Sequence, residues 1–162
     1  MPAGMKRKTL RDEIQQTKAF SSLEAEVFLN LLRTAEAVSV APLGLLRGAG
    51  LSQSQYNVLR ILRGAGDSRL SCREIVERMV TRDSDMTRLL DGLERKALVE
   101  RNRSERDRRV IVCQISASGL ELLAELDAPI QAVHTAQFEH LSQPKLKRLS
   151  RLLEETRQSP VP

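Results

Sequence analysis

The order of patterns in residues 81–116 constrains the fold most. A stretch with helical periodicity, about residues 84–96, is followed by a short apolar strand pattern at 98–101, and a second alternating strand pattern occupies residues 109–115. The turn between the strands, residues 103–109, contains four arginines. A helix followed by a basic β-hairpin can place the helix in a major groove and the hairpin tip at the flanking backbone or minor groove. The segment therefore predicts a unit that contacts a nucleic acid duplex.

The charge of the chain supports a partner that carries phosphates. The 162 residues have a formal net charge of +5 and a pI of about 9.7, and the length suffices for one core, or for a small domain with helical extensions. Between Arg95 and Arg109, seven basic residues face three acidic ones, a local excess of four positive charges. Most of the net charge is therefore concentrated in one short segment.

The sequence disfavours an exported protein, a membrane protein and an enzyme. The basic N-terminal stretch has no apolar core behind it, so we expect no signal peptide, and no apolar run approaches the roughly 20 residues that span a bilayer. Cys72 and Cys113 do not form a disulfide framework or a metal site, which favours a reducing cytoplasm. We find no glycine-rich phosphate loop and no nucleophile–base pattern, and therefore expect neither an enzyme nor a cofactor.

Five serines mark the expected starts of helices. Four have Glu or Gln three residues later, which is the capping-box pattern, and the fifth precedes a proline that suits a first helical turn. The pairs are Ser21–Glu24, Ser52–Gln55, Ser71–Glu74, Ser118–Glu121 and Ser142–Pro144. The first helix is expected to end or bend near Pro42, and the helix beginning at Ser118 to bend near Pro129.

The apolar periodicity predicts a mainly α-helical fold with a small β-hairpin. The helix expected at residues 72–79 should bury Ile75, Val76 and Met79, and Ile111, Cys113 and Ile115 should share one face of the second strand. Only residues 80–83 separate the third and fourth helices, which predicts a helix-turn-helix, and the two strands form a wing beside it. The sequence therefore predicts a winged helix-turn-helix.

The chain resembles the MarR-type transcriptional regulators over about residues 23–154. The segments that carry the resemblance are LSQSQYNVLRIL at 51–62, DMTRLLDGLERKALVER at 85–101 and DRRVIVCQISASG at 107–119. The resemblance implies a homodimer whose two winged lobes bind a pseudo-palindrome in double-stranded DNA. We expect a flexible basic segment at 1–20, a helical dimerisation region at 21–48 and 118–158, and a DNA-binding lobe at 49–117. Leucine stripes in the end helices exceed what one lobe needs to cover itself, which agrees with a second copy.

The resemblance also assigns roles to residues. Asp107 and Arg109 match a wing Asp-x-Arg pattern in which the carboxylate braces an arginine that enters a minor groove. Thr87 and Arg88 match helix positions that face bases and phosphates. The other DNA-binding candidates are Ser84, Asp85, Arg95, Arg103, Arg106 and Arg108, of which Arg95, Arg103 and Arg106 are expected at phosphates only. Alternatively, Arg88 pairs with Asp85 or Asp91 on its own helix, and Arg106 and Arg108 are solvated surface residues.

Three residues depart from the family pattern. Asp85 places an acid on the DNA-facing side, where it could accept from a cytosine amino group or pair with Arg88. Gly92 stands where the family has a bulkier residue, and a glycine inside a helix costs about 1 kcal/mol of helix propensity. Ala97 replaces the glycine that ends the helix, and a left-handed backbone would strain alanine, so the helix end is expected to differ.

The signal that the protein senses is not evident from the sequence. The resemblance implies a small-molecule effector, but the aromatic residues, Phe20, Phe28, Tyr56 and Phe138, are few and their pattern equally fits core or dimer packing. Cys72 is the candidate redox sensor because it begins a helix beside Arg73, where a thiolate is favoured; the alternative is a small buried thiol. His134 and His140 are six residues apart and do not share a helix face, so no metal site is expected.

These observations favour a dimeric DNA-binding repressor that is released from its operator by a small-molecule effector. Two alternatives remain at this point: a thiol-based redox regulator of the same fold, and a winged-helix protein-interaction module. The concentration of arginines in the wing disfavours the second, because a protein-docking wing does not require that charge.

Overall fold

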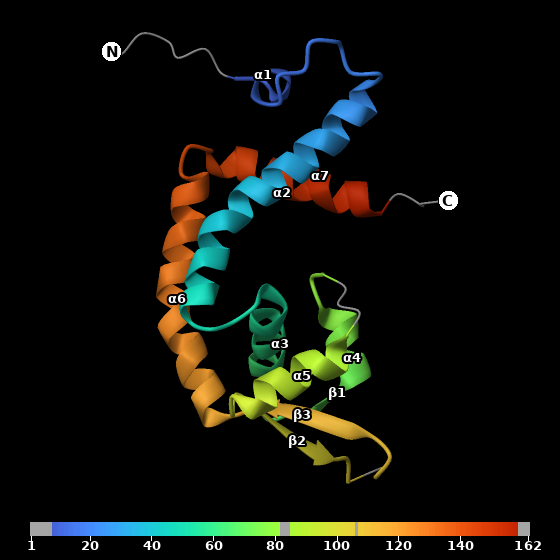
Figure 1. Cartoon of the computed structure of the whole chain (residues 1–162), viewed down its shortest axis with the longest axis vertical. Coiled ribbons are helices and arrows are strands. Elements are labelled where there is room, and N and C mark those ends of the chain that lie inside the picture. The colour runs from blue at the N-terminus through green and yellow to red at the C-terminus, as the bar shows by residue number, and fades with distance from the viewer. Residues whose placement is uncertain (1–7, 82–84, 106, 159–162) are drawn as a thin grey trace. The chain divides into compact units, whose positions relative to one another are not determined.

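The computed structural model describes residues 8–81, 85–105 and 107–158. The described part contains seven helices and three strands (Figure 1). Contacts divide the chain into two compact units, residues 1–40 and 41–162, which we describe separately. The elements are α1 (Leu10–Glu13), α2 (Leu23–Gly48), α3 (Gln53–Gly64), β1 (Leu70–Ser71), α4 (Cys72–Arg78), α5 (Met86–Arg95), β2 (Val99–Arg103), β3 (Ile111–Ile115), α6 (Ala117–Phe138) and α7 (Gln143–Arg157).

The first unit contains α1 and most of α2. Thr9 begins α1 with a capping box that includes Asp12, and Leu10 is buried. Glu13 forms an ion pair with Arg33 of α2 at 3.5 Å, which ties the two helices together. The hydroxyl of Ser22 accepts from the backbone N–H of Ala25, so the serine that caps α2 lies one position later than predicted.

Of the two outcomes predicted at Pro42, an end or a bend of the first helix, the end was wrong. Helix α2 continues through Pro42 to Gly48. A proline inside a helix removes one backbone hydrogen bond, but the residues beyond it contribute to the core, where Leu46 is buried and Leu45 is partly buried. This burial outweighs the lost hydrogen bond, and the helix is therefore not interrupted.

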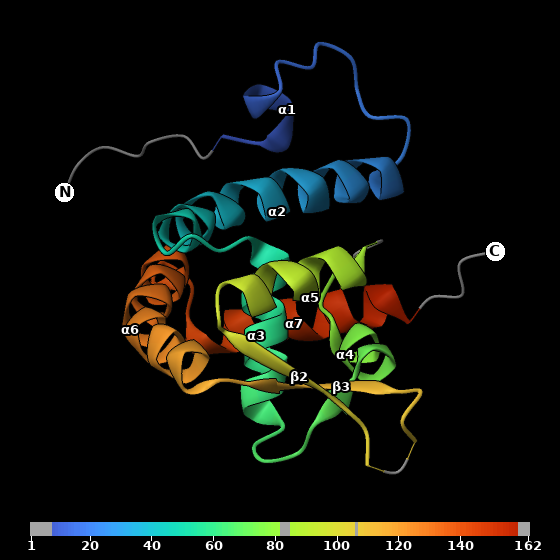
Figure 2. The ribbon, with the colours of Figure 1, turned by 60° about the horizontal axis from the view of Figure 1, so that its bottom comes forward.

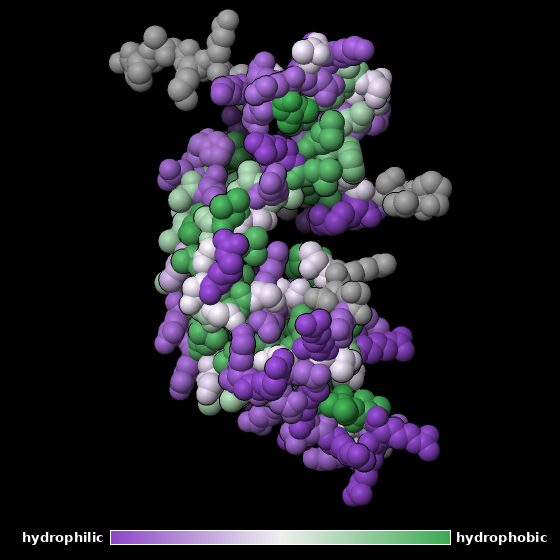
Figure 3. Space-filling model, viewed as in Figure 1, coloured by the Kyte–Doolittle hydropathy of each residue, from purple (hydrophilic) through white to green (hydrophobic). Residues whose placement is uncertain are grey.

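Five of the eleven large apolar side chains of α2 are exposed, and only Leu46 is fully buried. The exposed ones are Leu23, Val27, Phe28, Leu32 and Val40, and hydrophobic residues are visible along this helix in Figure 3. By length and composition alone, α2 is also apolar enough to cross a membrane, although no such segment was predicted. The same helix carries Glu24, Glu26, Arg33, Glu36 and Arg47, so it is amphipathic rather than uniformly apolar.

The core of the second unit lies between α3, α4, α5, the sheet and α6 (Figure 2). The most deeply buried side chains are Val58, Leu59 and Leu62 of α3, Ile75 of α4, Leu93 of α5, Cys113 of β3 and Leu123 of α6. Capping boxes begin α3 at Ser52 and α4 at Ser71, which confirms both predictions. Helix α3 is also joined to α6 by Arg63, which binds Asp127 through two hydrogen bonds of 2.8 and 2.9 Å. The guanidinium lowers the pKa of the Asp127 carboxyl.

The sheet has the strand order β1-β3-β2 and is antiparallel. The predicted hairpin is present, with Val99 opposite Ile115 and Arg103 opposite Ile111. Strand β1 was not predicted, because its two residues are too few for an alternating pattern. Cys113 and Ile115 are buried as expected, but Ile111 is 52% exposed because the hairpin extends beyond the core there. Val76 of α4, also expected to be buried, is 43% exposed.

Helix α6 begins two residues before its predicted start. Ser116, rather than Ser118, is the N-cap, and its hydroxyl accepts from the backbone N–H of Gly119 at 3.0 Å. The same hydroxyl donates to the carbonyl of Ala97 at 2.6 Å. The helix continues through Pro129 to Phe138. Helix α7 begins at the predicted Ser142, with Pro144 in its first turn.

Candidate nucleic-acid interface

Helices α4 and α5 form the predicted helix-turn-helix. Its turn is held from α3, where the side-chain oxygen Oδ1 of Asn57 accepts from the backbone N–H of Val80 at 2.9 Å. The candidate residue Ser84 lies outside the described residues. One side of α5 is buried against the core through Met86, Leu89, Leu90 and Leu93.

The opposite side of α5 is exposed and polar. Thr87, Arg88 and Arg95 all lie on the surface, as predicted. The proposed pairing of Arg88 with Asp91 is not what the structure contains, because the Asp91 carboxylate binds Arg101 instead. Arg95 donates from Nε to the backbone carbonyl of Asp91 at 3.3 Å, one turn earlier. The exposed side of α5 therefore presents two guanidinium groups, those of Arg88 and Arg95, on the surface of the lobe.

Asp85 has a structural role at the start of α5. Its Oδ1 accepts from the backbone N–H of Arg88 at 3.0 Å, so Asp85 is the N-cap of the helix. This hydrogen bond differs from the two roles predicted for Asp85, which were an ion pair with the Arg88 side chain and a contact with a cytosine amino group. Asp85 binds the backbone amide of Arg88 and not its guanidinium. An aspartate at this position satisfies one of the first free amides of the helix.

The end of α5 retains the left-handed residue that the family pattern requires. Ala97 has φ +56°. The N–H of Leu98 bonds to the carbonyl of Leu93, and that of Ala97 to the carbonyl of Glu94, which is a Schellman motif. The expectation of a different helix end was therefore wrong. The hydrogen bonds of this motif, together with that from Ser116 to Ala97, outweigh the cost of a left-handed alanine, about 1–2 kcal/mol.

The turn of the wing is organised by Asp107. Its Oδ1 accepts from the backbone N–H of Arg109 at 2.9 Å, and its carbonyl accepts from Val110 at 2.9 Å. The carboxylate therefore braces the backbone at Arg109 and not, as the resemblance had implied, the arginine side chain. Arg103, Arg108 and Arg109 are exposed around this turn, and Arg106 lies outside the described residues. Figure 3 shows mainly hydrophilic residues over this end of the hairpin.

Arg101 is a residue whose role sequence reasoning missed. It was counted with the free basic residues, but its side chain is only 15% exposed and lies against α5. It pairs with Asp91 at 2.7 Å and with Glu94 at 3.6 Å, and it donates to the carbonyl of Thr87 at 3.2 Å. Arg101 thus joins strand β2 of the wing to α5. Two acids three residues apart on one helix were the available signal.

The candidate redox sensor lies at the edge of the core. Cys72 is the first residue of α4 and is partly buried against the hydrophobic cluster. Its neighbour Arg73, which was expected to favour a thiolate, forms an ion pair with Glu77 at 2.9 Å. Cys113 is buried, and burial raises the pKa of its thiol, as expected for a structural cysteine.

Comparison with known proteins agrees with this arrangement. Residues 51–111 match the model of the MarR family. The chain is 29% identical over 108 residues to the HTH-type transcriptional repressor YetL of Bacillus subtilis, and the match covers 65% of each protein. A crystal structure of a MarR transcription factor from Planctomyces limnophilus is 34% identical, with a TM-score of 0.65, and the match covers 84% of this chain and 98% of that one.

A further structure shows the fold alone. BpsR of Bordetella bronchiseptica is 17% identical, with a TM-score of 0.77 over 88% of this chain and 100% of that one. Its structure concerns the regulation of DNA binding by 6-hydroxynicotinic acid. The helix-turn-helix, the wing and these matches lead to one conclusion: the chain belongs to the MarR family of winged-helix transcriptional regulators, and is not an enzyme.

Proposed function

We propose that the protein is a dimeric, cytoplasmic repressor that binds a pseudo-palindromic operator and is released by a small-molecule effector. The observation that supports it best is the rigid connection of two exposed basic surfaces. The outer side of α5 and the arginines of the wing are joined through Arg101, and both belong to one lobe. A fixed spacing between two such surfaces is what binding to one duplex requires.

In this proposal α5 enters a major groove. Thr87 and Arg88 face base edges and phosphates, while Arg95 contacts phosphate only. The wing follows the neighbouring minor groove, into which Arg109 extends, and Arg103 and Arg108 lie near the backbone. The bond from Asp107 to the Arg109 amide supports this role, because a fixed turn reduces the entropy lost when the arginine is inserted.

Dimerisation and effector release rest on separate observations. The exposed apolar side chains of α2, and Leu149 and Leu152 of α7, are surfaces that a second copy would cover. Effector control is supported by the BpsR structure, in which a small aromatic acid regulates DNA binding. An effector that separates the two α5 helices would prevent them from fitting half-sites about one helical turn apart.

Selection of genomic DNA fragments tests the central claim. The wild-type protein is expected to enrich an inverted repeat. The Arg109→Ala variant is expected to bind that repeat roughly 30-fold more weakly, because a contact worth about 1 kcal/mol is lost in each of two wings. The slope of the logarithm of affinity against the logarithm of salt concentration should fall by about one unit per wing.

The matched control for this variant is Arg157→Ala, which removes the same charge from the last residue of α7. It is expected to bind within about twofold of the wild type. Equal affinities of wild type and Arg109→Ala across the salt titration would remove Arg109 from the interface. Enrichment of no inverted repeat by the wild type would instead overturn the regulator proposal.

The Arg101→Leu variant is expected to bind the operator about tenfold more weakly, although Arg101 is not placed at the DNA. Without the guanidinium, Asp91 and Glu94 present two uncompensated carboxylates beside the DNA-binding side of α5, and they repel phosphates. The measurement is a titration of labelled operator at fixed salt concentration.

A triple variant separates this indirect effect from direct contact. Adding Asp91→Asn and Glu94→Gln to Arg101→Leu removes both carboxylate charges, and most of the affinity is expected to return. Affinity that stays as low as in the single variant would mean that the loss comes from the missing connection between β2 and α5, or from a direct contact of Arg101 with the DNA, and not from the two carboxylates.

A further inference from the structure

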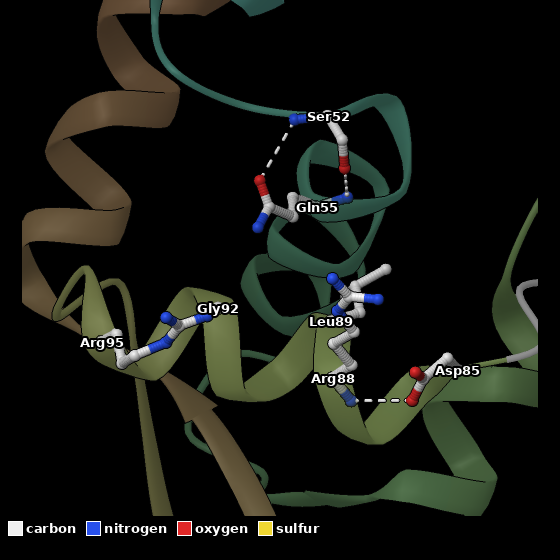
Figure 4. A pocket seen from close by; sticks show the side chains of 7 residues that line it. All are labelled: Ser52, Gln55, Asp85, Arg88, Leu89, Gly92 and Arg95. Carbon is white, nitrogen blue, oxygen red and sulfur yellow. Dashed lines mark hydrogen bonds between the residues drawn. The ribbon is translucent and has the colours of Figure 1, made fainter.

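An open pocket of about 380 Å³ lies between α5 and the start of α3. Ser52 and Gln55 line it from α3, and Asp85, Arg88, Leu89, Gly92 and Arg95 line it from the region of α5 (Figure 4). None of the sequence motifs assigned a function to the start of α3. The pocket nevertheless adjoins two arginines of the exposed side of α5, which makes α3 part of the same surface.

Gly92 provides the space that this pocket occupies. A Cβ atom at residue 92 would lie 3.0 Å from Nε2 of Gln55, closer than most real contacts. The helix tolerates a glycine at a cost of about 1 kcal/mol. The residue that departs from the family pattern therefore opens a recess in α5, opposite the carboxamide of Gln55.

The hydrogen bonds of the α3 cap decide which end of Gln55 faces this recess. Its Oε1 accepts from the backbone N–H of Ser52 at 3.1 Å, and the Ser52 hydroxyl accepts from the N–H of Gln55 at 3.1 Å. Because Oε1 is bound within the cap, the group beside Gly92 is the amide Nε2, a hydrogen-bond donor.

The other polar groups of the pocket give it a positive character. Arg88 and Arg95 are exposed, and among the described residues no carboxylate forms an ion pair with either. Asp85 is the one acid in the lining. It lies at the opposite end of the pocket from Arg95 (Figure 4) and accepts from the Arg88 amide as a helix cap. Two guanidinium groups and an amide donor are the chemistry that binds a phosphate oxygen.

We propose that this pocket binds a backbone phosphate of the duplex that α5 enters, with Gln55, Arg88 and Arg95 as donors. The inference rests on the proposed function. A free anion has the same chemistry, but the pocket is open, so water competes with any ion that arrives alone. A DNA phosphate is delivered by the surrounding contacts at high effective concentration, and therefore binds where a free ion does not. Contact from α3 would fix the register of the lobe on the backbone.

The Gln55→Glu variant tests this proposal without removing the cap. Glutamate is the other usual residue of a capping box, so its carboxylate can still accept from the Ser52 amide. The amide donor, however, is replaced by a negative charge beside the bound phosphate. We expect the melting temperature to stay within about 2 °C of the wild type, and operator affinity at low salt to fall about tenfold.

Gln53→Glu is the matched control. Gln53 is the exposed first residue of α3, and it does not line the pocket. The same charge at that position should weaken binding by no more than about threefold, through the general field of the protein. Equal affinities of the two variants would overturn the proposal, since the effect would then not depend on the pocket.

Two further measurements distinguish the DNA from other sources of the anion. Ethylation interference should identify a phosphate whose modification weakens wild-type binding but has no further effect on Gln55→Glu. The absence of such a position would also overturn the proposal.

Replacing chloride with inorganic phosphate at constant ionic strength should not weaken operator binding by the wild type more than operator binding by Gln55→Glu. Competition that disappears in Gln55→Glu would show a site for free anions instead. In all of these, wild-type binding to the inverted repeat remains, so the proposed function is tested separately.

Discussion

Replacing Gly119 with alanine is expected to lower the free energy of unfolding by about 3 kcal/mol. A Cβ atom at residue 119 would lie 2.4 Å from the backbone carbonyl oxygen of Leu98 and 2.7 Å from Cγ1 of Ile115. The first of these atoms belongs to the backbone and cannot turn away as the end of a side chain can. The variant must therefore separate α6 from the sheet or distort both.

The position of Gly119 explains why the loss is large. Its N–H bonds to the hydroxyl of Ser116, and that hydroxyl also bonds to the carbonyl of Ala97. The start of α6 is thus joined to the loop that ends α5. A displacement of α6 breaks this junction in addition to the packing, because its hydrogen bonds depend on the close approach of the glycine.

Denaturation by urea, followed by circular dichroism, measures the effect. Gly64→Ala is the control, because a Cβ atom there meets nothing within 4 Å and the residue lies in α3. The control should be as stable as the wild type, or up to about 1 kcal/mol more stable. Equal stability of Gly119→Ala and Gly64→Ala would show that α6 does not pack on the sheet as described.

The local signals of the sequence predicted the lobe well. The boxes at Ser52 and Ser71 involve only residues within one turn, so the sequence contains all the information needed to identify them. The start of α6 was misplaced because Ser118 has the same pattern as a true cap. The choice of Ser116 depends on its bond to Ala97, 19 residues away, which no local pattern contains.

The sequence predicted which residues of the candidate site are exposed better than it predicted the contacts that they make. Thr87, Arg88, Arg95 and Arg109 are exposed where they were expected. Asp85 and Asp107 bind the arginines that were expected, Arg88 and Arg109, but through the backbone amides and not through the guanidinium groups. The role of Arg101 was missed because its acids come from α5, and the closeness of Gln55 to Gly92 was missed because the two lie 37 residues apart in the chain. Such contacts arise only when the elements pack together.

If the protein is a dimer as proposed, the Phe28→Glu variant is expected to be monomeric at concentrations where the wild type is not. Phe28 is 59% exposed on α2, among the exposed residues Leu23, Val27 and Leu32. Covering a phenylalanine side chain contributes about 2 kcal/mol, and a symmetric dimer contains two copies, so the loss is roughly 4 kcal/mol. This corresponds to a rise of roughly 1,000-fold in the dissociation constant. Desolvation of the new carboxylate at the interface raises the dissociation constant further.

Sedimentation velocity over a range of concentrations measures the dissociation, and operator titration measures its consequence. Gln53→Glu adds the same charge to the exposed start of α3 and should remain dimeric. The monomeric variant should lose binding to the full inverted repeat much more than to one half-site, because the second lobe no longer binds at high effective concentration.

A wild-type protein that sediments as a monomer would contradict the proposed dimer. One that requires detergent, or sediments with lipid vesicles, would show that the apolar side chains of α2 are covered by a membrane instead.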